Sequence, residues 1–245
     1  MQLYDSIIKD VYARLSQRPS RSYAYRPERA WKDQGESELV MRRDEAFELG
    51  GDGMPAVNFS CVTTDKNLVE GDEILVIGKD LPEISSPVPF ARLAFLLIRD
   101  IAVEEGDTEP LFRAVQDMDF VKYHVFPEGY MVRTSSENHR EQVRISKAAK
   151  KAGICFERVG CDYIRRYKQD PNVLAVKLVF LTDPRIDYKA LTADSRSVHD
   201  ITMTLSKILE GMPTDCGSCN LKPICDEVEG MKELHFGKNK AEFKG

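Results

Sequence analysis

The chain has 245 residues, of which 42% are hydrophobic and 31% charged, as in an ordinary globular protein. Its net charge of −5 and its pI near 5.5 exclude a generic nucleic-acid binder, which needs a basic surface to engage phosphates. Residues 1–10 lack the apolar core of a secretory signal, and the longest apolar stretch, residues 87–98, is about half of the ~20 residues that span a bilayer. We therefore expect a cytoplasmic protein without nucleic-acid or membrane partners.

Hydrophobic periodicity and the positions of Gly and Pro predict the elements of the first half of the chain. In chain order they are a helix over 3–17, an irregular segment over 18–31, a short helix or strand over 39–49, strands over 56–63 and 73–78, and an apolar helix or strand over 90–104. We favour a strand for the first part of the last segment, which Arg92 interrupts with a charge.

The second half reads as a further alternation of helices and strands. In chain order we predict a helix over 109–118, a hairpin over 121–134 turning at 127–129, a helix over 136–152 capped by Ser135 or Ser136 and ended by Gly153, a helix over 158–168, a strand over 173–182 and a helix over 195–210. The fold class is therefore mixed α/β or α+β, with a central mixed sheet flanked by helices and a short Cys-bearing C-terminal segment. We expect an N-terminal helix and irregular segment over 1–38, an α/β domain over 39–190, and a helix with a metal-binding tail over 191–245.

The strongest chemical signal is a C-x2-C-x5-C motif formed by Cys216, Cys219 and Cys225. Thiolates two residues apart reach one metal from a tight turn, and clustered cysteines in a cytosolic chain more often bind metal than form disulfides. Three nearby thiolates suit three corners of a [4Fe–4S] cluster, whereas a structural zinc site more often shows a second Cys or His pair. We predict an iron–sulfur cluster, with zinc, or three reduced cysteines in a loop, as the alternatives.

Such a site needs a fourth ligand from elsewhere in the chain. Cys155 and Cys161 are the leading candidates, followed by Cys61 and His235. The motif and its spacing do not choose among them.

A resemblance to a known family is carried by several blocks that occur in the family's order. They are RRDEAFELGG (42–51), DEILVIGKDLPEI (72–84), PFARLAFLLIRDI (89–101), EGYMVRTSSENHREQVRISKAAKKAG (128–153) and VKLVFLTD (176–183). In these blocks the chain resembles the middle domain of the nickel–iron acetyl-CoA synthase family, the beta subunit of the CO dehydrogenase/acetyl-CoA synthase complex. The resemblance implies the fold of that domain and a setting in anaerobic one-carbon metabolism.

The chain departs from that family in its cysteines. Family enzymes continue into a nickel domain with a Cys-Gly-Cys unit, which this sequence lacks, and the C-x2-C-x5-C spacing differs from that of the family's active site. We therefore carry over no catalytic residue and do not expect nickel. The chain's enzymatic status stays open.

Arginines are dense in the second half of the chain, and the resemblance implies that some could contact coenzyme A. The set is Arg133, Arg140, Arg144, Arg158, Arg165 and Arg166, of which Arg144, Arg165 and Arg166 are the candidate coenzyme A ligands. The alternative, which we favour, is a solvated helix face with Glu137, Glu141 and Glu157 as ionic partners. Similarly, Trp31 could stack on an adenine, but a packing role is the better expectation.

The leading functional hypothesis is an accessory or electron-transfer subunit with one [4Fe–4S] cluster. It would act with a protein partner in a one-carbon or corrinoid enzyme complex, with ferredoxin as a further partner. The alternatives are a partial acetyl-CoA synthase component that contributes a coenzyme A or ferredoxin surface, and a non-enzymatic scaffold with structural zinc.

Overall fold

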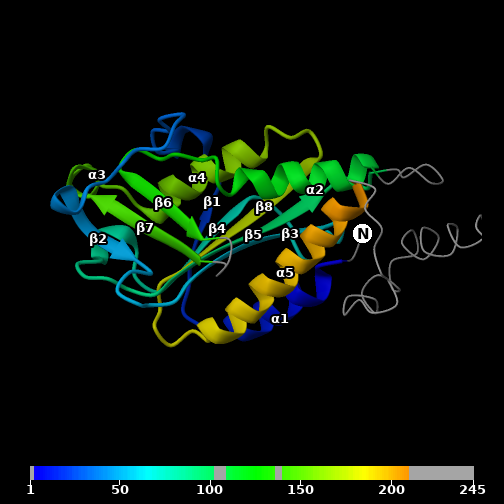
Figure 1. Cartoon of the computed structure of the whole chain (residues 1–245), viewed down its shortest axis with the longest axis horizontal. Helices are drawn as coiled ribbons and strands as arrows, with labels where there is room; N and C mark the ends of the chain where they lie inside the picture. Colours follow the sequence, from blue (N-terminus) through cyan, green and yellow to red (C-terminus); the bar gives the residue numbers. More distant parts are fainter. Residues whose placement is uncertain (1–2, 102–108, 136–139, 210–245) are drawn as a thin grey trace, which may run out of the picture.

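A five-stranded sheet forms the centre of the protein (Figure 1). The structure is a computed structural model, and it describes residues 3–101, 109–135 and 140–209. In sheet order, the strands are β1 (Arg21–Ala24), β4 (Glu73–Ile77), β8 (Val173–Leu181), β5 (Phe90–Ile98) and β3 (Ala56–Thr63). Strands and helices alternate along the chain, which confirms the mixed α/β class.

The two central strands, β5 and β8, are the most deeply buried. β5 is antiparallel to β8 and parallel to β3, while β4 is parallel to β8, so the sheet is mixed. All nine residues of β5 are buried. A strand covered on both faces needs apolar side chains on both, which explains why residues 90–98, apolar except for Arg92, form a strand.

Five α-helices lie in the described residues. They are α1 (Asp5–Leu15), α2 (Glu109–Val121), α3 (Lys147–Lys151), α4 (Phe156–Tyr167) and α5 (Tyr188–Leu209). Within this part of the chain, no helix combines the length and apolar character that crossing a membrane requires. Short 3-10 turns occur at Pro27–Arg29, Arg42–Asp44 and Leu81–Glu83.

Different elements cover the two faces of the central sheet. Tyr12 of α1 packs edge-on against Phe95 of β5, with ring centroids 5.2 Å apart. Because successive side chains of a strand point to opposite faces, Arg92 lies on the other face. That face carries Phe180, whose ring stacks 4.4 Å from Phe156 of α4. The central sheet therefore lies between α1 and α4.

α5 runs along the edge strand β3 and beside α1 (Figure 1). Ser195 of α5 donates a hydrogen bond to the backbone carbonyl of Asn58 in β3, at 3.0 Å. The Arg14 guanidinium in α1 pairs with the Asp194 carboxylate in α5. These contacts join the two ends of the described chain on one side of the sheet.

A second, three-stranded antiparallel sheet packs against one end of the first. Its strands are β2 (Glu45–Leu49), β7 (Arg140–Ser146) and β6 (Tyr130–Ser135), in the order β2-β7-β6. Burial along β7 alternates residue by residue, so one face of this sheet points inward and the other outward. The second sheet lies on the same face of the central sheet as the Arg92 side chain, because that side chain bonds to Glu141 of β7.

Two predictions in this region are wrong. The predicted hairpin over 121–134 is in fact the end of α2, a loop and β6, and the hairpin is instead formed by β6 and β7. The predicted helix over 136–152 is β7 followed by the short helix α3, with residues 136–139 outside the described part. Arg, Glu and Gln favour helices in isolation, but the alternating Glu141, Val143 and Ile145 fit the inward face of a half-buried strand.

The remaining helices and strands lie close to their predicted positions. The segment at 39–49 contains a 3-10 turn and β2, and the segment at 90–104 begins with β5. The prediction does not include β1, which lies within residues 18–31, a segment expected to be irregular. It is a four-residue edge strand that pairs antiparallel with β4. The predicted division into 1–38, 39–190 and 191–245 stays a prediction.

Candidate functional site

A buried ion pair connects the two sheets. The guanidinium of Arg92 in β5 donates two hydrogen bonds to the carboxylate of Glu141 in β7, at 2.8 and 2.6 Å. The side chains are 1% and 0% exposed. The Arg92 guanidinium also donates to the backbone carbonyl of Lys122 at 2.8 Å, and the Asn58 amide donates to Glu141. Bidentate geometry and extra hydrogen bonds are what a charge pair needs to be retained in a protein interior.

Three tyrosines surround this ion pair. The ring of Tyr163 lies 4.2 Å from the Arg92 guanidinium, in cation–π geometry. Burial raises the pKa of the Tyr163 and Tyr130 phenols, so both are neutral at physiological pH. Among the described groups, neither phenol oxygen has a hydrogen-bond partner, whereas the Tyr167 hydroxyl lies 3.1 Å from that of Ser60. The interior between the sheets is therefore charged and aromatic.

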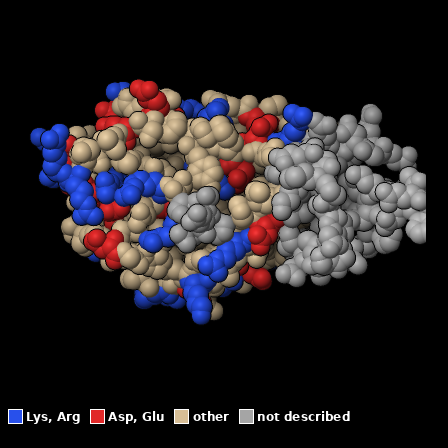
Figure 2. Space-filling model, in the orientation of Figure 1, with Lys and Arg blue, Asp and Glu red and all other residues tan. Residues whose placement is uncertain are grey.

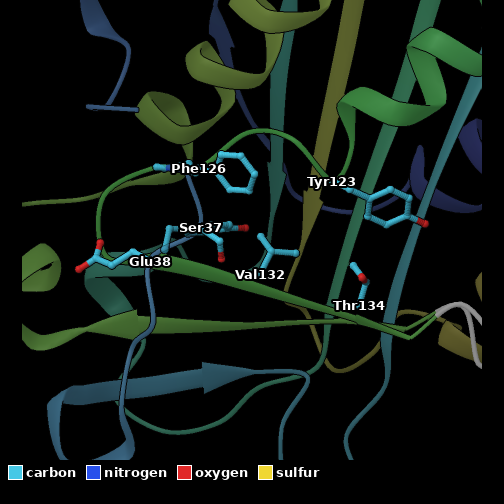
Figure 3. A pocket seen from close by; sticks show the side chains of 8 residues that line it. Ser37, Glu38, Tyr123, Phe126, Val132 and Thr134 are labelled. Atoms are coloured by element: carbon cyan, nitrogen blue, oxygen red, sulfur yellow. The ribbon is translucent and has the colours of Figure 1, made fainter. Parts of the chain in front are cut away.

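A pocket of about 210 Å³ lies next to this buried network (Figure 3). It is lined by Ser37, Glu38, Tyr123, Phe126, Pro127, Tyr130, Val132 and Thr134. Tyr130, Val132 and Thr134 are alternate residues of β6 and therefore share one face of that strand. Figure 3 shows Phe126 opposite Ser37 and Val132, with Tyr123 opposite Thr134. Tyr130 belongs both to the pocket and to the surroundings of the ion pair.

One side of the pocket is formed by a strap, residues 31–41, that follows β6. The indole N–H of Trp31 donates to the Glu128 carbonyl at 2.8 Å, and the backbone N–H of Gln34 donates to the Phe126 carbonyl at 2.9 Å. Further along, the Glu38 carboxylate accepts a hydrogen bond from the backbone N–H of Gly129 at 2.6 Å. These bonds hold Ser37 and Glu38 beside β6.

Trp31 anchors the start of this strap. It is 7% exposed, and the Arg158 guanidinium of α4 lies 4.1 Å from its ring centroid. The indole is therefore packed between α4 and the loop before β6, where it fixes the strap.

The three candidate coenzyme A ligands lie on two different elements. Arg144 is on β7, where its guanidinium lies 3.2 Å from the Glu45 carboxylate and 3.6 Å from that of Glu48. Arg165 and Arg166 are in the last turn of α4. The Arg165 guanidinium pairs with Asp162 at 2.6 Å, and that of Arg166 donates to Gln169. Their assignment to coenzyme A stays a prediction.

The other arginines of the set also have their own partners. Arg140 donates to the backbone carbonyls of Gly50 and Met54, and Arg133 lies 3.8 Å from Glu48. Of the expected acidic partners, Glu141 binds Arg92 and Glu157 binds Arg29, while residue 137 is outside the described part. Figure 2 shows Lys and Arg interspersed with Asp and Glu on the face it displays.

The predicted metal motif lies outside the described residues, since Cys216, Cys219, Cys225 and His235 all follow residue 209. Cys61 in β3 and Cys161 in α4 are fully buried, whereas Cys155, which precedes α4, is partly exposed. Within the described ranges, no group of three or more His, Cys, Asp or Glu side chains could hold a metal ion. The metal site at Cys216, Cys219 and Cys225 stays a prediction.

The sequence reasoning missed both the ion pair and the pocket. Arg92 interrupts an otherwise apolar run, and a charge inside such a strand is itself a signal, because it requires a buried partner. Glu141 was assigned to an exposed helix face. The pocket depends on contacts between residues 37–38 and 123–134, which are far apart in the sequence and follow no motif.

A comparison with known families supplies the evolutionary context. Residues 31–186 match the family described as the CO dehydrogenase/acetyl-CoA synthase complex beta subunit. The matched region is well over half of the chain and contains both sheets except for β1. It also contains the ion pair and the pocket. No curated protein sequence matches the chain.

Proposed function

The chain belongs to the CO dehydrogenase/acetyl-CoA synthase complex beta subunit family, and we propose that it is an acetyl-CoA synthase-like subunit acting in CO and acetyl-CoA metabolism. The observation that carries this proposal is the match over residues 31–186. Because the family is named for a subunit of a complex, we infer that the chain works with a protein partner. Its role there is accessory or in electron transfer.

The proposed cofactor is a [4Fe–4S] cluster held by Cys216, Cys219 and Cys225. When bound, such a cluster supplies a one-electron carrier. The described residues fit this arrangement in one respect, because they offer a fourth thiol outside the core. Cys155 is partly exposed and precedes α4, and the backbone N–H of Arg158 donates to its sulfur. Burial raises the pKa of the Cys155 thiol, and this N–H donor only partly offsets that effect, so the bound cluster itself would have to stabilise the thiolate.

The other candidate thiols are less suited as ligands. Cys61 lies within β3 and Cys161 within α4, and both are fully buried in the hydrophobic core. Either would have to leave that core to meet the C-terminal motif. We therefore propose Cys155 as the fourth ligand, with His235 as the alternative outside the described residues.

Anaerobic metal analysis tests the cofactor. We expect a brown protein with broad absorbance near ~400 nm and about four irons per chain. Cys216→Ala and Cys155→Ala should each lower the iron content, while Cys161→Ala, on the same helical region, should not. A colourless protein with one zinc per chain would contradict the proposed cluster. Nickel retained by the chain would contradict the proposed accessory or electron-transfer role.

The role in a complex is tested separately. Mixed anaerobically with the other subunits of a CO dehydrogenase/acetyl-CoA synthase complex, the chain should co-elute with them in size-exclusion chromatography. Migration of the chain alone at every concentration tested would contradict the proposal.

A coenzyme A surface is the second candidate function. It is supported by two neighbouring guanidinium groups at the end of α4, of which Arg165 has a side chain 44% exposed. Coenzyme A binding measured by calorimetry should then weaken in Arg165→Ala and Arg166→Ala. Arg29→Ala, which removes an exposed arginine of another element, is the matched control.

A further inference from the structure

Exposed apolar side chains flank the pocket on both sides. Leu39 and Met41, which follow the lining residue Glu38 in the strap, are 69% and 46% exposed. Across the pocket, Tyr123 is 40% exposed, and Phe120, three residues before it, is 52% exposed. Exposed apolar groups around a cavity are typical of a surface that a second protein covers.

The cavity has the dimensions of a side-chain site. A cavity of about 150 Å³ accepts a benzene ring, so the 210 Å³ here can hold an aromatic or large aliphatic side chain. A small molecule that filled this space would leave Leu39 and Phe120 in water. A protein segment with one residue in the pocket would cover them as well.

The strap beside the pocket is acidic. Between residues 32 and 38 the sequence has three acids, Asp33, Glu36 and Glu38, and one base, Lys32. The ammonium of Lys32 is paired with Glu128 at 3.1 Å. Of the eight lining residues, none is Lys or Arg. Figure 3 shows the Glu38 carboxylate turned away from Val132, so the negative charge lies at the rim of the pocket. The lining combines aromatic and apolar side chains with the polar Ser37 and Thr134.

The pocket also lies at the edge of a sheet. In the order β2-β7-β6, β6 pairs with β7 on one side only. The strap approaches β6 at Met131, whose side-chain sulfur accepts a hydrogen bond from the backbone N–H of Val40. From Val132 to Thr134 no strand of the described chain pairs with that edge. An open edge accepts an extended segment, which presents a side chain at every second residue.

We propose that the pocket between the strap and β6 is the docking site for a partner protein, which inserts one large apolar side chain from an extended segment rich in Lys and Arg. The apolar side chain would lie against Phe126, Tyr130 and Val132, and its basic neighbours would lie against Glu36 and Glu38. This inference rests on the proposed role of the chain as a subunit of a complex, and it places the contact with the partner protein at this pocket.

Labelled peptides test the proposal on the full chain. The probe is a nine-residue peptide with a central phenylalanine flanked on each side by two basic residues, and binding is followed by fluorescence anisotropy and by backbone NMR shifts. We expect shifts at Ser37, Val132 and Thr134. Replacing the phenylalanine with alanine should weaken binding by about tenfold or more, as for an interface anchor. Replacing the basic residues with Glu and Asp should abolish it.

Two test variants and one control variant of the protein complete the test. Thr134→Trp places an indole in the pocket and should abolish binding, whereas Leu174→Trp, an exposed strand position on the first sheet, should leave it unchanged. Glu36→Lys changes only the charge of the strap and should weaken binding. Equal binding of the phenylalanine and alanine peptides, equal binding of the basic and acidic peptides, or an unaffected Thr134→Trp would each overturn the proposal. Iron content should stay unchanged in both variants, so loss of docking and loss of the cluster are separate results.

Discussion

The two sheets of this protein bury their residues in different ways. In the central sheet, β5 is buried along its whole length and consists almost entirely of apolar side chains. In the second sheet, β7 alternates buried and half-buried residues, and its buried positions include the charged Glu141. The first sheet is stabilised mainly by the hydrophobic effect, whereas the second joins the same core through apolar residues such as Val143 and Ile145 and, in addition, through a charge pair.

This difference has a consequence for how each sheet responds to substitution. A well-packed apolar strand loses stability in proportion to the surface and volume removed. A buried ion pair behaves otherwise, because removing one partner leaves an uncompensated charge in the interior. We therefore expect single substitutions of Arg92 or Glu141 to lower the stability of the contact between the two sheets the most.

The largest effect is expected from breaking that pair. Arg92→Met should lower the free energy of unfolding by about 3–5 kcal/mol, because Glu141 stays buried without its guanidinium. Glu141→Leu should have an effect of the same order. The double variant should recover most of the loss, since two apolar side chains replace both charges. Urea unfolding of the four proteins measures this coupling, and a double variant as unstable as the sum of the two single variants would contradict it.

The second prediction concerns Asp162 of α4, which faces the strap beside the second sheet. Its carboxylate is fully buried, with one oxygen 2.6 Å from Arg165 and the other without a partner among the described groups. Burial raises its pKa to about 7, and the charge of Asp33 adds to the effect, whereas Arg165 and Arg158 oppose it. The folded state therefore binds a proton at this site that the unfolded state has released.

The sign of the pH dependence follows from that difference. Between an unfolded pKa of about 4 and the folded pKa of about 7, the native state holds more protons, so this group's contribution to stability falls as pH rises. The slope is about 1.4 kcal/mol per pH unit. Asp162→Asn should remove this slope. Unfolding free energies of wild type and variant at pH 4.5, 5.5 and 6.5 test it, and parallel curves would show that the site does not titrate in this range.

The central sheet was largely predictable from the sequence, whereas the second sheet was not. The apolar run at 74–77 and the run at 173–181, which only Lys177 interrupts, favour buried strands, and both lie in strands. β7 was misassigned because its charged residues favour a helix locally, and only its partners β2 and β6 and the buried Arg92 make it a strand. Tertiary contacts therefore determine that β7 is a strand, and such contacts leave no local pattern in the sequence.

The candidate sites follow the same division. Cys216, Cys219 and Cys225 are recognised by spacing alone and stay a prediction, since they lie outside the described residues. The pocket unites residues 37–38 with residues 123–134, and the ion pair joins Arg92 to Glu141, and no spacing rule would find them. What could have pointed to them is Arg92, a charge in an otherwise apolar strand.

The smallest effect is expected where the second sheet passes into a helix. β7 ends at Ser146, whose hydroxyl caps α3 by accepting a hydrogen bond from the backbone N–H of Ala149 at 3.0 Å. The predicted cap at Ser135 or Ser136 is therefore wrong by ten residues or more. Ser146→Ala should lower the free energy of unfolding by about 1 kcal/mol, the usual cost of removing an N-cap.

The control for this prediction is Ser85→Ala, an exposed serine in a loop, which should change stability by less than about 0.5 kcal/mol. Chemical denaturation distinguishes the two variants. If both behave alike, Ser146 does not cap a helix, and the segment after β7 would have to be reassigned. A lower free energy of unfolding in Ser146→Ala alone shows that β7 ends and α3 begins at this residue. The charged stretch 140–151 is then part strand and part helix, which a single helical pattern cannot describe.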